Sequence, residues 1–154
     1  MDIKIAQKPA FAVAGVLLEA IDNSLCPSAW NQLFEEQSLE TLASLGNGQS
    51  YGICSDVKEG EIINYMAGYD VTDQRKAKAL GLTIMEIEPA EYAIIPVKGP
   101  IPRSIHQAWK YVLENFFPET GYRHSGAPDF EVYAEGEMDS PDYEMELWIP
   151  IVKV

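Results

Sequence analysis

The chain has 154 residues, of which 47% are hydrophobic, so it can bury a substantial core and is not a disordered tail. Twenty-four acidic residues against eleven basic ones give a formal net charge of -13, which repels a nucleic-acid surface and excludes direct binding to DNA or RNA. The same charge is typical of a soluble globular protein and, more weakly, favours a positively charged ligand.

The two cysteines and the first apolar run exclude further classes. Cys26 and Cys54 are isolated and form no CxxC pair, so we expect reduced, packed thiols rather than a disulfide framework, zinc or redox chemistry. The run "AFAVAGVLLEAI" follows no basic segment, and Glu19 interrupts it well short of the ~20 apolar residues that a membrane span needs. The sequence therefore predicts a cytoplasmic protein that contacts no membrane and holds no cofactor or metal.

The two halves of the chain repeat one order of elements. In the first half a Pro-Ala pair leads into the strand-like run "AFAVAGV", a helix follows around Trp30, and "SYGICSDV" and "IINYMAGYDV" are two further strand-like runs. In the second half the same order reads "AEYAIIPV", a helix around Trp109, "FEVYAEG" and "YEMELWIPIV". The sequence predicts a β-α-β-β unit that occurs twice, over about residues 1–80 and 81–154 of a single domain spanning 1–154.

Apolar spacing and prolines predict where the two helices begin and end. Apolar residues recur at helical spacing from Ile105 to Phe116, with Pro102 suited to the first turn and Pro118 expected to end the helix. The first helix is expected to break at Ser38.

One helix covers only one face of a three-stranded sheet, so each copy must bury its other face against something. Pairing the two copies meets this need. We therefore predict an α+β domain with pseudo-two-fold symmetry, in which antiparallel sheets form a ligand groove and the helices lie outside.

Alternation along the strands divides core positions from groove positions. In the last strand, Glu146 and Trp148 are predicted to face the groove. The aliphatic set that they interrupt is predicted to face the helix: Met145, Leu147, Ile149 and Ile151. In residues 130–135 the same logic sends Phe130 and Val132 to the core and Tyr133, with Glu131, to the groove. The polar Asn64 favours Tyr65 and Tyr69 as groove aromatics in the first copy.

A carboxylate beside aromatic rings is the constellation that points to a ligand. Burial disfavours an unpaired carboxylate, and a bound organic cation relieves that cost while it stacks on the rings. The acidic run "EGEMDSPDYEME" lacks the spacing of a calcium loop and is better explained as a solvated hairpin. His106 and His124 are each isolated in sequence and are expected at the surface, so no catalytic residue is assigned.

An ordered set of motifs resembles a known bacterial family, the GyrI-like small-molecule-binding domains of AraC-type and MerR-type multidrug-sensing transcription regulators. The motifs are "YGIC", "NYMAGYDV", "PAEYAIIPVKGP", "IHQAWKYVLENFFPETGYR", "PDFEVY" and "ELWIPI". The resemblance implies the duplicated fold and an aromatic pocket for lipophilic, often cationic drugs. It also implies that Glu146 is the acidic contact and that Tyr65, Tyr133 and Trp109 are wall residues, although the helical stripe of Trp109 predicts a core position.

The sequence shows no helix-turn-helix, so we expect a stand-alone binding module rather than a regulator. Three hypotheses follow, in this order. The first is binding of a lipophilic cation without turnover, with Glu146 paired to the cation. The second is hydrolysis of cyclopropane-type toxins, an activity that the resemblance also allows, with Glu146 as general base. The third is inhibition of a basic protein partner such as DNA gyrase, which the acidic surface would attract.

Overall fold

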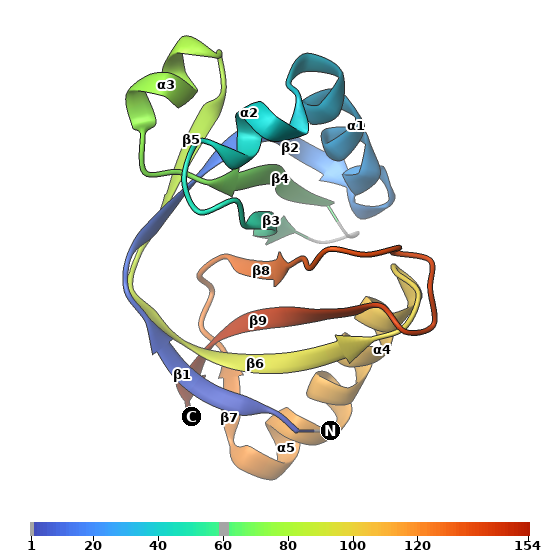
Figure 1. The fold of residues 1–154 in the computed structure, drawn as a ribbon. Coiled ribbons are helices and arrows are strands. Elements are labelled where there is room, and N and C mark those ends of the chain that lie inside the picture. Colours follow the sequence, from blue (N-terminus) through green and yellow to red (C-terminus); the bar gives the residue numbers. More distant parts are fainter. Residues whose placement is uncertain (1, 59–61) are drawn as a thin grey trace. The chain divides into compact units, whose positions relative to one another are not determined.

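A computed structural model of the protein describes residues 2–58 and 62–154 and shows a mixed α and β structure (Figure 1). The chain divides into two compact units. We call Pro9–Pro89 the N-terminal unit, and Met1–Lys8 together with Ala90–Val154 the C-terminal unit. Each unit contains one copy of the β-α-β-β order, so the predicted α+β fold with a duplicated unit is confirmed. The predicted groove between the two sheets stays a prediction.

The N-terminal unit consists of an antiparallel sheet and the helices that connect its strands. Its elements are β2 (Phe11–Asp22), a 3-10 turn (Asn23–Leu25), α1 (Cys26–Glu36), α2 (Leu39–Ala43), β3 (Ser50–Lys58), β4 (Ile62–Asp70), α3 (Gln74–Ala79) and β5 (Thr83–Ile87). The strands pair in the order β3-β4-β2-β5. The apolar side chains that α1 and α2 turn towards the sheet, Ala29, Leu33 and Leu42, are fully buried in its core.

The break between α1 and α2 falls where the sequence predicts it. The Ser38 hydroxyl accepts a hydrogen bond from the backbone N–H of Thr41 at 3.2 Å, which caps the first turn of α2. A proline lies in the first turn of α1, where a backbone N–H has no acceptor within the helix, so the N–H that proline lacks costs no hydrogen bond.

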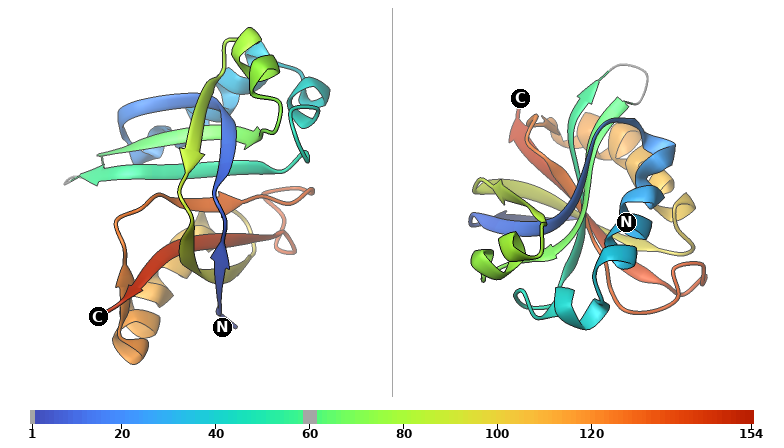
Figure 2. Two further views of the ribbon diagram at one scale, coloured as in Figure 1. Left: turned by 90° about the vertical axis from the view of Figure 1, so that its left-hand side faces the viewer. Right: turned by 90° about the horizontal axis from the view of Figure 1, so that it is seen from above.

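The strands of the C-terminal unit also pair antiparallel. Its elements are β1 (Lys4–Lys8), β6 (Ala90–Lys98), α4 (Arg103–Tyr111), a π-helical segment (Val112–Phe116), α5 (Phe117–Thr120), β7 (Tyr122–His124), β8 (Asp129–Val132) and β9 (Glu144–Lys153). The strands pair in the order β1-β6-β9-β8, and β7 pairs with the end of β9. Figure 2 shows α4 and α5 against one side of this sheet.

The second helix does not end at Pro118 as predicted. The π-helical segment shifts the helical register, and Pro118 then lies in the first turn of α5, where its missing N–H is tolerated. The chain leaves the helix at Gly121, whose φ of 77° is the left-handed conformation that ends many helices.

In each copy of the sequence repeat, the strand that comes first in the chain, which we call the leading strand, pairs with a strand of the other copy. β1 precedes the N-terminal unit in sequence but pairs with β6 of the C-terminal unit. β5 precedes β6 in sequence but pairs with β2 of the N-terminal unit. The boundaries of the compact units therefore differ from the boundaries of the sequence repeat.

The sheet of the C-terminal unit has two distinct faces. The aliphatic face of β9 is buried as predicted: Met145, Leu147, Ile149 and Ile151 are all at most 5% exposed. Residues directly opposite each other in an antiparallel pair lie on the same face. The register therefore defines the other face, which we call the tryptophan face, by the residues Lys4, Ala6 and Lys8 on β1, Tyr92, Ile94 and Pro96 on β6, Glu146, Trp148 and Pro150 on β9, and Phe130 and Val132 on β8.

Candidate functional site

The candidate site is built around Glu146 and Trp148, two residues apart on β9. Alternation puts both on the tryptophan face, where Glu146 is exposed and Trp148 is half-buried. The indole Nε1–H of Trp148 donates a hydrogen bond to Oε1 of Glu146 at 3.1 Å. This charge-assisted bond fixes the carboxylate beside the ring and leaves its second oxygen open to a ligand.

Two buried rings support Trp148 from the neighbouring strands. Tyr92 of β6 and Phe130 of β8 are both fully buried, with ring centroids 5.1 Å apart. The centroid of each lies 5.6 Å from that of Trp148, edge-on for Tyr92 and stacked for Phe130. Such contacts hold the indole in one orientation, so the tryptophan face carries a preformed aromatic wall with one partly open ring.

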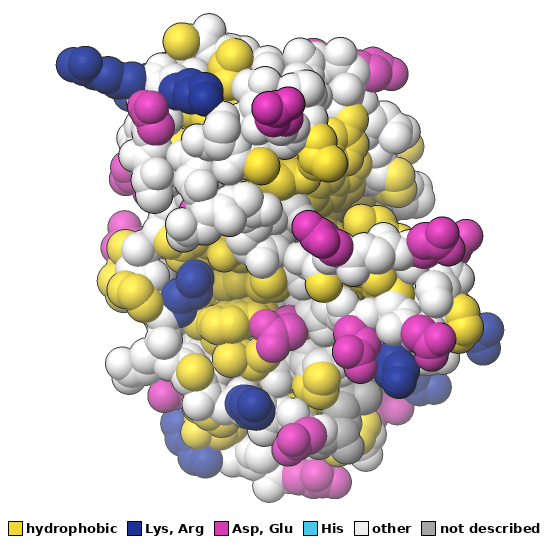
Figure 3. Space-filling view, viewed as in Figure 1, with side chains coloured by type: hydrophobic (Ala, Val, Ile, Leu, Met, Phe, Trp, Pro, Cys, Tyr) yellow, Lys and Arg dark blue, Asp and Glu magenta, His cyan; other side chains and the backbone are white. Residues whose placement is uncertain are grey.

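Glu146 has no cationic partner of its own in the described ranges. Its direct neighbours across the sheet are Pro96 on β6 and Val132 on β8, which are apolar. Among the side chains that the structure describes, no basic group lies at ion-pair distance from it. Figure 3 shows apolar surface over β6, β8 and β9 bordered by acidic and basic side chains. The arrangement offers an organic cation an aromatic surface and a carboxylate together.

A lysine lies over the same tryptophan. The ammonium of Lys8 is 5.7 Å from the centroid of the Trp148 ring, within the range of a cation–π contact. Lys8 is not predictable as a site residue from the sequence, because only the pairing of β1 with β6 brings the start of the chain to this face. The hydrophobic pattern around Lys8 contains no signal of that pairing.

The hydroxyl of Tyr92 is the second feature that sequence reasoning missed. It is buried and has no hydrogen-bond partner among the described residues. Burial also raises the pKa of the Tyr92 phenol, which stays neutral. A buried hydroxyl without a partner costs free energy, and such a group is a candidate for a role beyond packing.

The predicted facing of residues 130–135 is wrong. Phe130 lies opposite Trp148 and Val132 opposite Glu146, so both are on the tryptophan face. Glu131 lies opposite Leu147 on the other face, and it accepts a hydrogen bond of 2.5 Å from the hydroxyl of Tyr133 just beyond the strand. Alternation alone could not decide the facing because both faces of this sheet are largely apolar, whereas the stacking of Phe130 on Trp148 decides it.

Trp109 lies in a different cluster of the C-terminal unit. Its half-buried indole stacks on the ring of His124, with centroids 6.3 Å apart and planes within 15°. His124 Nε2 lies 3.1 Å from Oδ2 of the buried Asp129. The backbone N–H of Gly126 donates to His124 Nδ1 at 2.9 Å, so Nε2 carries the proton and donates to Asp129.

His124 is therefore not the isolated surface residue that the sequence suggests. Burial raises the pKa of Asp129, and the hydrogen bond and charge of His124 oppose that rise. Both ring nitrogens of His124 are engaged, which is the arrangement of a structural clamp on the loop between β7 and β8 rather than of a general base.

Tyr65 and Tyr69 lie in the N-terminal unit on the face that α1 covers. Tyr65 is 2% exposed, and its hydroxyl accepts a hydrogen bond from Trp30 Nε1 at 2.9 Å. Tyr69 belongs to the same core cluster. The predicted facing of both is wrong, while a role of either in binding stays a prediction.

Asn64, which suggested the wrong facing, is polar for a local reason. Its amide accepts from the backbone of Ala20 at 2.8 Å and donates to the carboxylate of Asp56 at 3.0 Å. Ala20 and Asp56 have φ angles of 51° and 49°, and each lies at a register shift of its strand. Asn64 thus satisfies polar groups that these two bulges leave unpaired.

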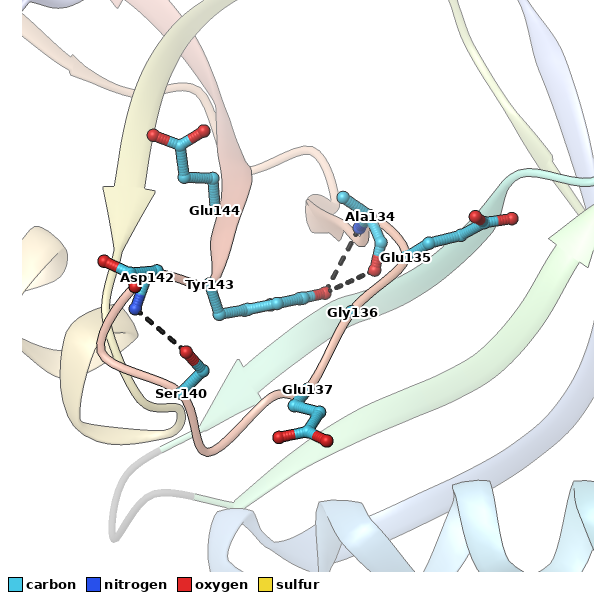
Figure 4. A pocket seen from close by; sticks show the side chains of 8 residues that line it. All are labelled: Ala134, Glu135, Gly136, Glu137, Ser140, Asp142, Tyr143 and Glu144. Atoms are coloured by element: carbon cyan, nitrogen blue, oxygen red, sulfur yellow. Dashed lines mark hydrogen bonds between the residues drawn. The ribbon is translucent and has the colours of Figure 1, made fainter.

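A hollow of about 460 Å³ lies in the loop between β8 and β9. Its acidic lining residues are Glu135, Glu137, Asp142 and Glu144, and Figure 4 shows their carboxylates pointing away from one another. The Tyr143 hydroxyl ties the loop by donating to Ala134 O at 2.8 Å and accepting from Ala134 N at 3.2 Å. No group of metal-ligating side chains occurs in the part of the chain that the structure describes. The expected solvated hairpin fits this geometry better than a metal site.

The fold defines a class of duplicated antiparallel α+β proteins, and the comparison with known families makes the class specific. The family model of the GyrI-like small molecule binding domain matches residues 1–152, so the chain belongs to that family. The resemblance seen in the sequence is confirmed. No curated protein matches the chain.

Solved structures share this fold at low sequence identity. SAV2435 bound to tetraphenylphosphonium is 19% identical over 99% of this chain and 94% of its own, with a TM-score of 0.81. A putative bacterial transcription regulation protein from Staphylococcus aureus MU50 is 18% identical over 98% of both chains, with a TM-score of 0.76. A hydrolase from Listeria innocua is 12% identical over 97% of this chain and 91% of its own, with a TM-score of 0.63. In the described residues no helix has the length and apolar character to span a membrane.

Proposed function

We propose that this protein binds a lipophilic organic cation on the tryptophan face, as a ligand-binding protein of the GyrI-like family. The observation that carries the proposal is the bond between Trp148 Nε1 and Glu146 beside the rings of Tyr92 and Phe130. The ring supplies a π face and apolar area to the body of the ligand, and the carboxylate supplies the opposite charge. The neighbour solved with tetraphenylphosphonium supports this class of ligand.

The proposal assigns unequal roles to the predicted site residues. Glu146 and Trp148 make the direct contact with the cation. Tyr133 and Trp109 lie in the same unit, but they contact Glu131 and His124, which lie on the opposite face of the sheet, so a role of either in binding stays a prediction. Tyr65 and Tyr69 are proposed as residues of the N-terminal core that ligand binding leaves undisturbed.

Titration with tetraphenylphosphonium, followed by tryptophan fluorescence and calorimetry, tests the proposal. Glu146→Gln keeps an oxygen that accepts the Trp148 N–H but removes the charge. We expect it to weaken binding by about 5- to 30-fold, because water screens the charge of an exposed carboxylate until the ligand covers it. Glu144→Gln is the matched control, since it removes one charge from the same strand and lies outside the aromatic cluster. Equal affinity in the two variants would refute the role of Glu146.

Hydrolysis is the second candidate, because a structural neighbour is described as a hydrolase. Glu146 is exposed and could take a proton from water attacking a bound electrophile. Mass spectrometry of a cyclopropane-containing toxin after incubation with the protein tests this activity. We rank it below binding because the hydrogen-bond partner of Glu146 is the indole N–H of Trp148, which cannot serve as a second acid or base in hydrolysis. A hydrated product that disappears in Glu146→Gln would reverse the ranking.

A further inference from the structure

Lys8 reaches Trp148 across the strand that separates them. Lys8 lies opposite Ala90 on β6, and Trp148 of β9 lies opposite Ile94 on the other edge of β6. Neighbouring strands are about 4.8 Å apart, and the partner positions Ala90 and Ile94 are four residues apart on β6, so Lys8 must reach both across β6 and along it to meet Trp148. Ala90 and Ala6 are small residues on the path, and they leave room for the four-carbon stem of the lysine.

The contact between Lys8 and Trp148 uses the surface that the proposed ligand needs. An ammonium 5.7 Å from the ring centroid is attracted by the negative π face. A ligand cation that stacks on Trp148 is attracted by the same face, and two cations over one ring repel each other. A ligand must therefore displace the ammonium before it stacks.

We propose that Lys8 is an internal competitor that selects bulky aromatic cations over small ammonium ions. This inference rests on the proposed function of the tryptophan face. A small hydrated cation can make only the cation–π contact that the Lys8 ammonium already makes. Lys8 has the advantage because it is covalently attached to the strand. A large aromatic cation also buries apolar area on Trp148 and on its partly exposed neighbours Ile94 and Pro96, and this gain exceeds what the ammonium gains. The lysine then swings towards water on its flexible stem.

Affinity measurements on matched lysine variants test the inference. Lys8→Met keeps an apolar stem over the face and removes the charge, and Lys8→Arg keeps the charge. Lys153→Met is the control, because Lys153 also lies over a ring, 4.3 Å from the centroid of Tyr122, and removing it changes the net charge equally. The probes are tetraphenylphosphonium and tetramethylammonium, titrated separately and in competition.

We expect Lys8→Met to tighten tetraphenylphosphonium binding by about 2- to 5-fold and to tighten tetramethylammonium binding by a larger factor. Lys8→Arg should bind no more tightly than the wild type, and Lys153→Met should match the wild type. If the wild type binds and Lys8→Met behaves like Lys153→Met, the competitor role is wrong while the proposed function stands. If no variant binds either probe, both are wrong.

Nuclear magnetic resonance of the wild type gives a readout that does not depend on any variant folding. The ε-methylene protons of Lys8 should resonate upfield in the free protein because they lie over an indole ring. They should return towards the usual lysine position when tetraphenylphosphonium is added. An unshifted signal in the free protein, or a shifted signal that the ligand leaves unchanged, would overturn the inference.

Discussion

The two units share one order of elements, but their last strands in that order, β4 and β9, carry their aromatic residues on opposite faces. In the N-terminal unit, Tyr65 and Tyr69 of β4 face α1 and pack in the core. In the C-terminal unit, the buried residues that β9 turns to its helix are aliphatic, and Trp148 lies on the other face. The offset of 80 residues that separates the two Pro-Ala pairs preserves the face, so the counterpart of Glu146 is Met66, which is 0% exposed. The repeat sets the topology, whereas the chemistry of each face is set separately in each copy.

The largest expected effect is on stability and comes from placing the acidic residue of the C-terminal copy at the counterpart position of the N-terminal copy. Met66→Glu would bury a carboxylate among apolar side chains, and we expect the free energy of unfolding to fall by more than about 3 kcal/mol. Glu146→Met, at the counterpart position, should change it by less than about 1 kcal/mol because that side chain is exposed. Urea denaturation followed by circular dichroism measures both. Similar losses in the two variants would contradict the comparison.

The next effect is on ligand affinity and compares Trp148 of β9 with Tyr69 of β4. Trp148→Leu removes the π face and should weaken tetraphenylphosphonium binding by about 2 kcal/mol, roughly 30-fold. Tyr69→Phe in the N-terminal core is the matched change and should leave the affinity unaltered. Calorimetric titration of both variants with tetraphenylphosphonium measures the two affinities. A loss of affinity in Tyr69→Phe would return Tyr69 to the ligand site.

Tyr65→Phe should lower stability rather than affinity. The change removes the hydroxyl that accepts the part-buried Trp30 N–H, at a cost of about 1 kcal/mol in the free energy of unfolding. Denaturation midpoints and a tetraphenylphosphonium titration on the same sample separate the two effects. Weaker binding at unchanged stability would mean that Tyr65 contacts the ligand, as the sequence suggested.

The smallest effect is a pH dependence that belongs to the C-terminal unit. Asp129 is the only charged side chain that is buried among the described residues, and burial raises its pKa. The folded protein then holds this proton more tightly than the unfolded chain, so acidification stabilises the fold through Asp129 and the gain is lost as pH rises through the raised pKa.

Asp129→Asn removes this titration and isolates it. As the pH falls through the raised pKa of Asp129 towards the ordinary aspartate value of 3.8, the stability of the wild type should rise relative to that of the variant. The stability difference measured by denaturation at several pH values tests the sign. A difference that is constant with pH would contradict it.

The parts of the fold that sequence patterns predicted are the local ones. The β-α-β-β order, the break at Ser38 and the alternation around Glu146 each depend on residues close in the chain, and all three are confirmed. The facing of Phe130 depends on a ring contact across strands, and the polarity of Asn64 depends on bulges in two neighbouring strands. Such contacts leave no trace in a single stretch of sequence.

The candidate site was predictable to the same extent. Glu146 and Trp148 were paired correctly because a strand places residues two apart on one face. Lys8 and Tyr92 were missed because each reaches Trp148 only through a neighbouring strand. For Lys8 that strand lies at the far end of the sequence, where no periodicity connects it to β9.

The exchange of leading strands has a consequence for synthesis of the chain. β1 is the first of these strands to leave the ribosome, but its partner positions on β6 run to Ile94, so the whole N-terminal unit is made before β1 can pair. During that interval β1 has an unsatisfied edge, whereas the N-terminal sheet is completed by β5 just before β6 appears. Ribosome-bound chains that stop after β5 should therefore contain a folded N-terminal sheet, while β1 at their start has not yet paired with β6.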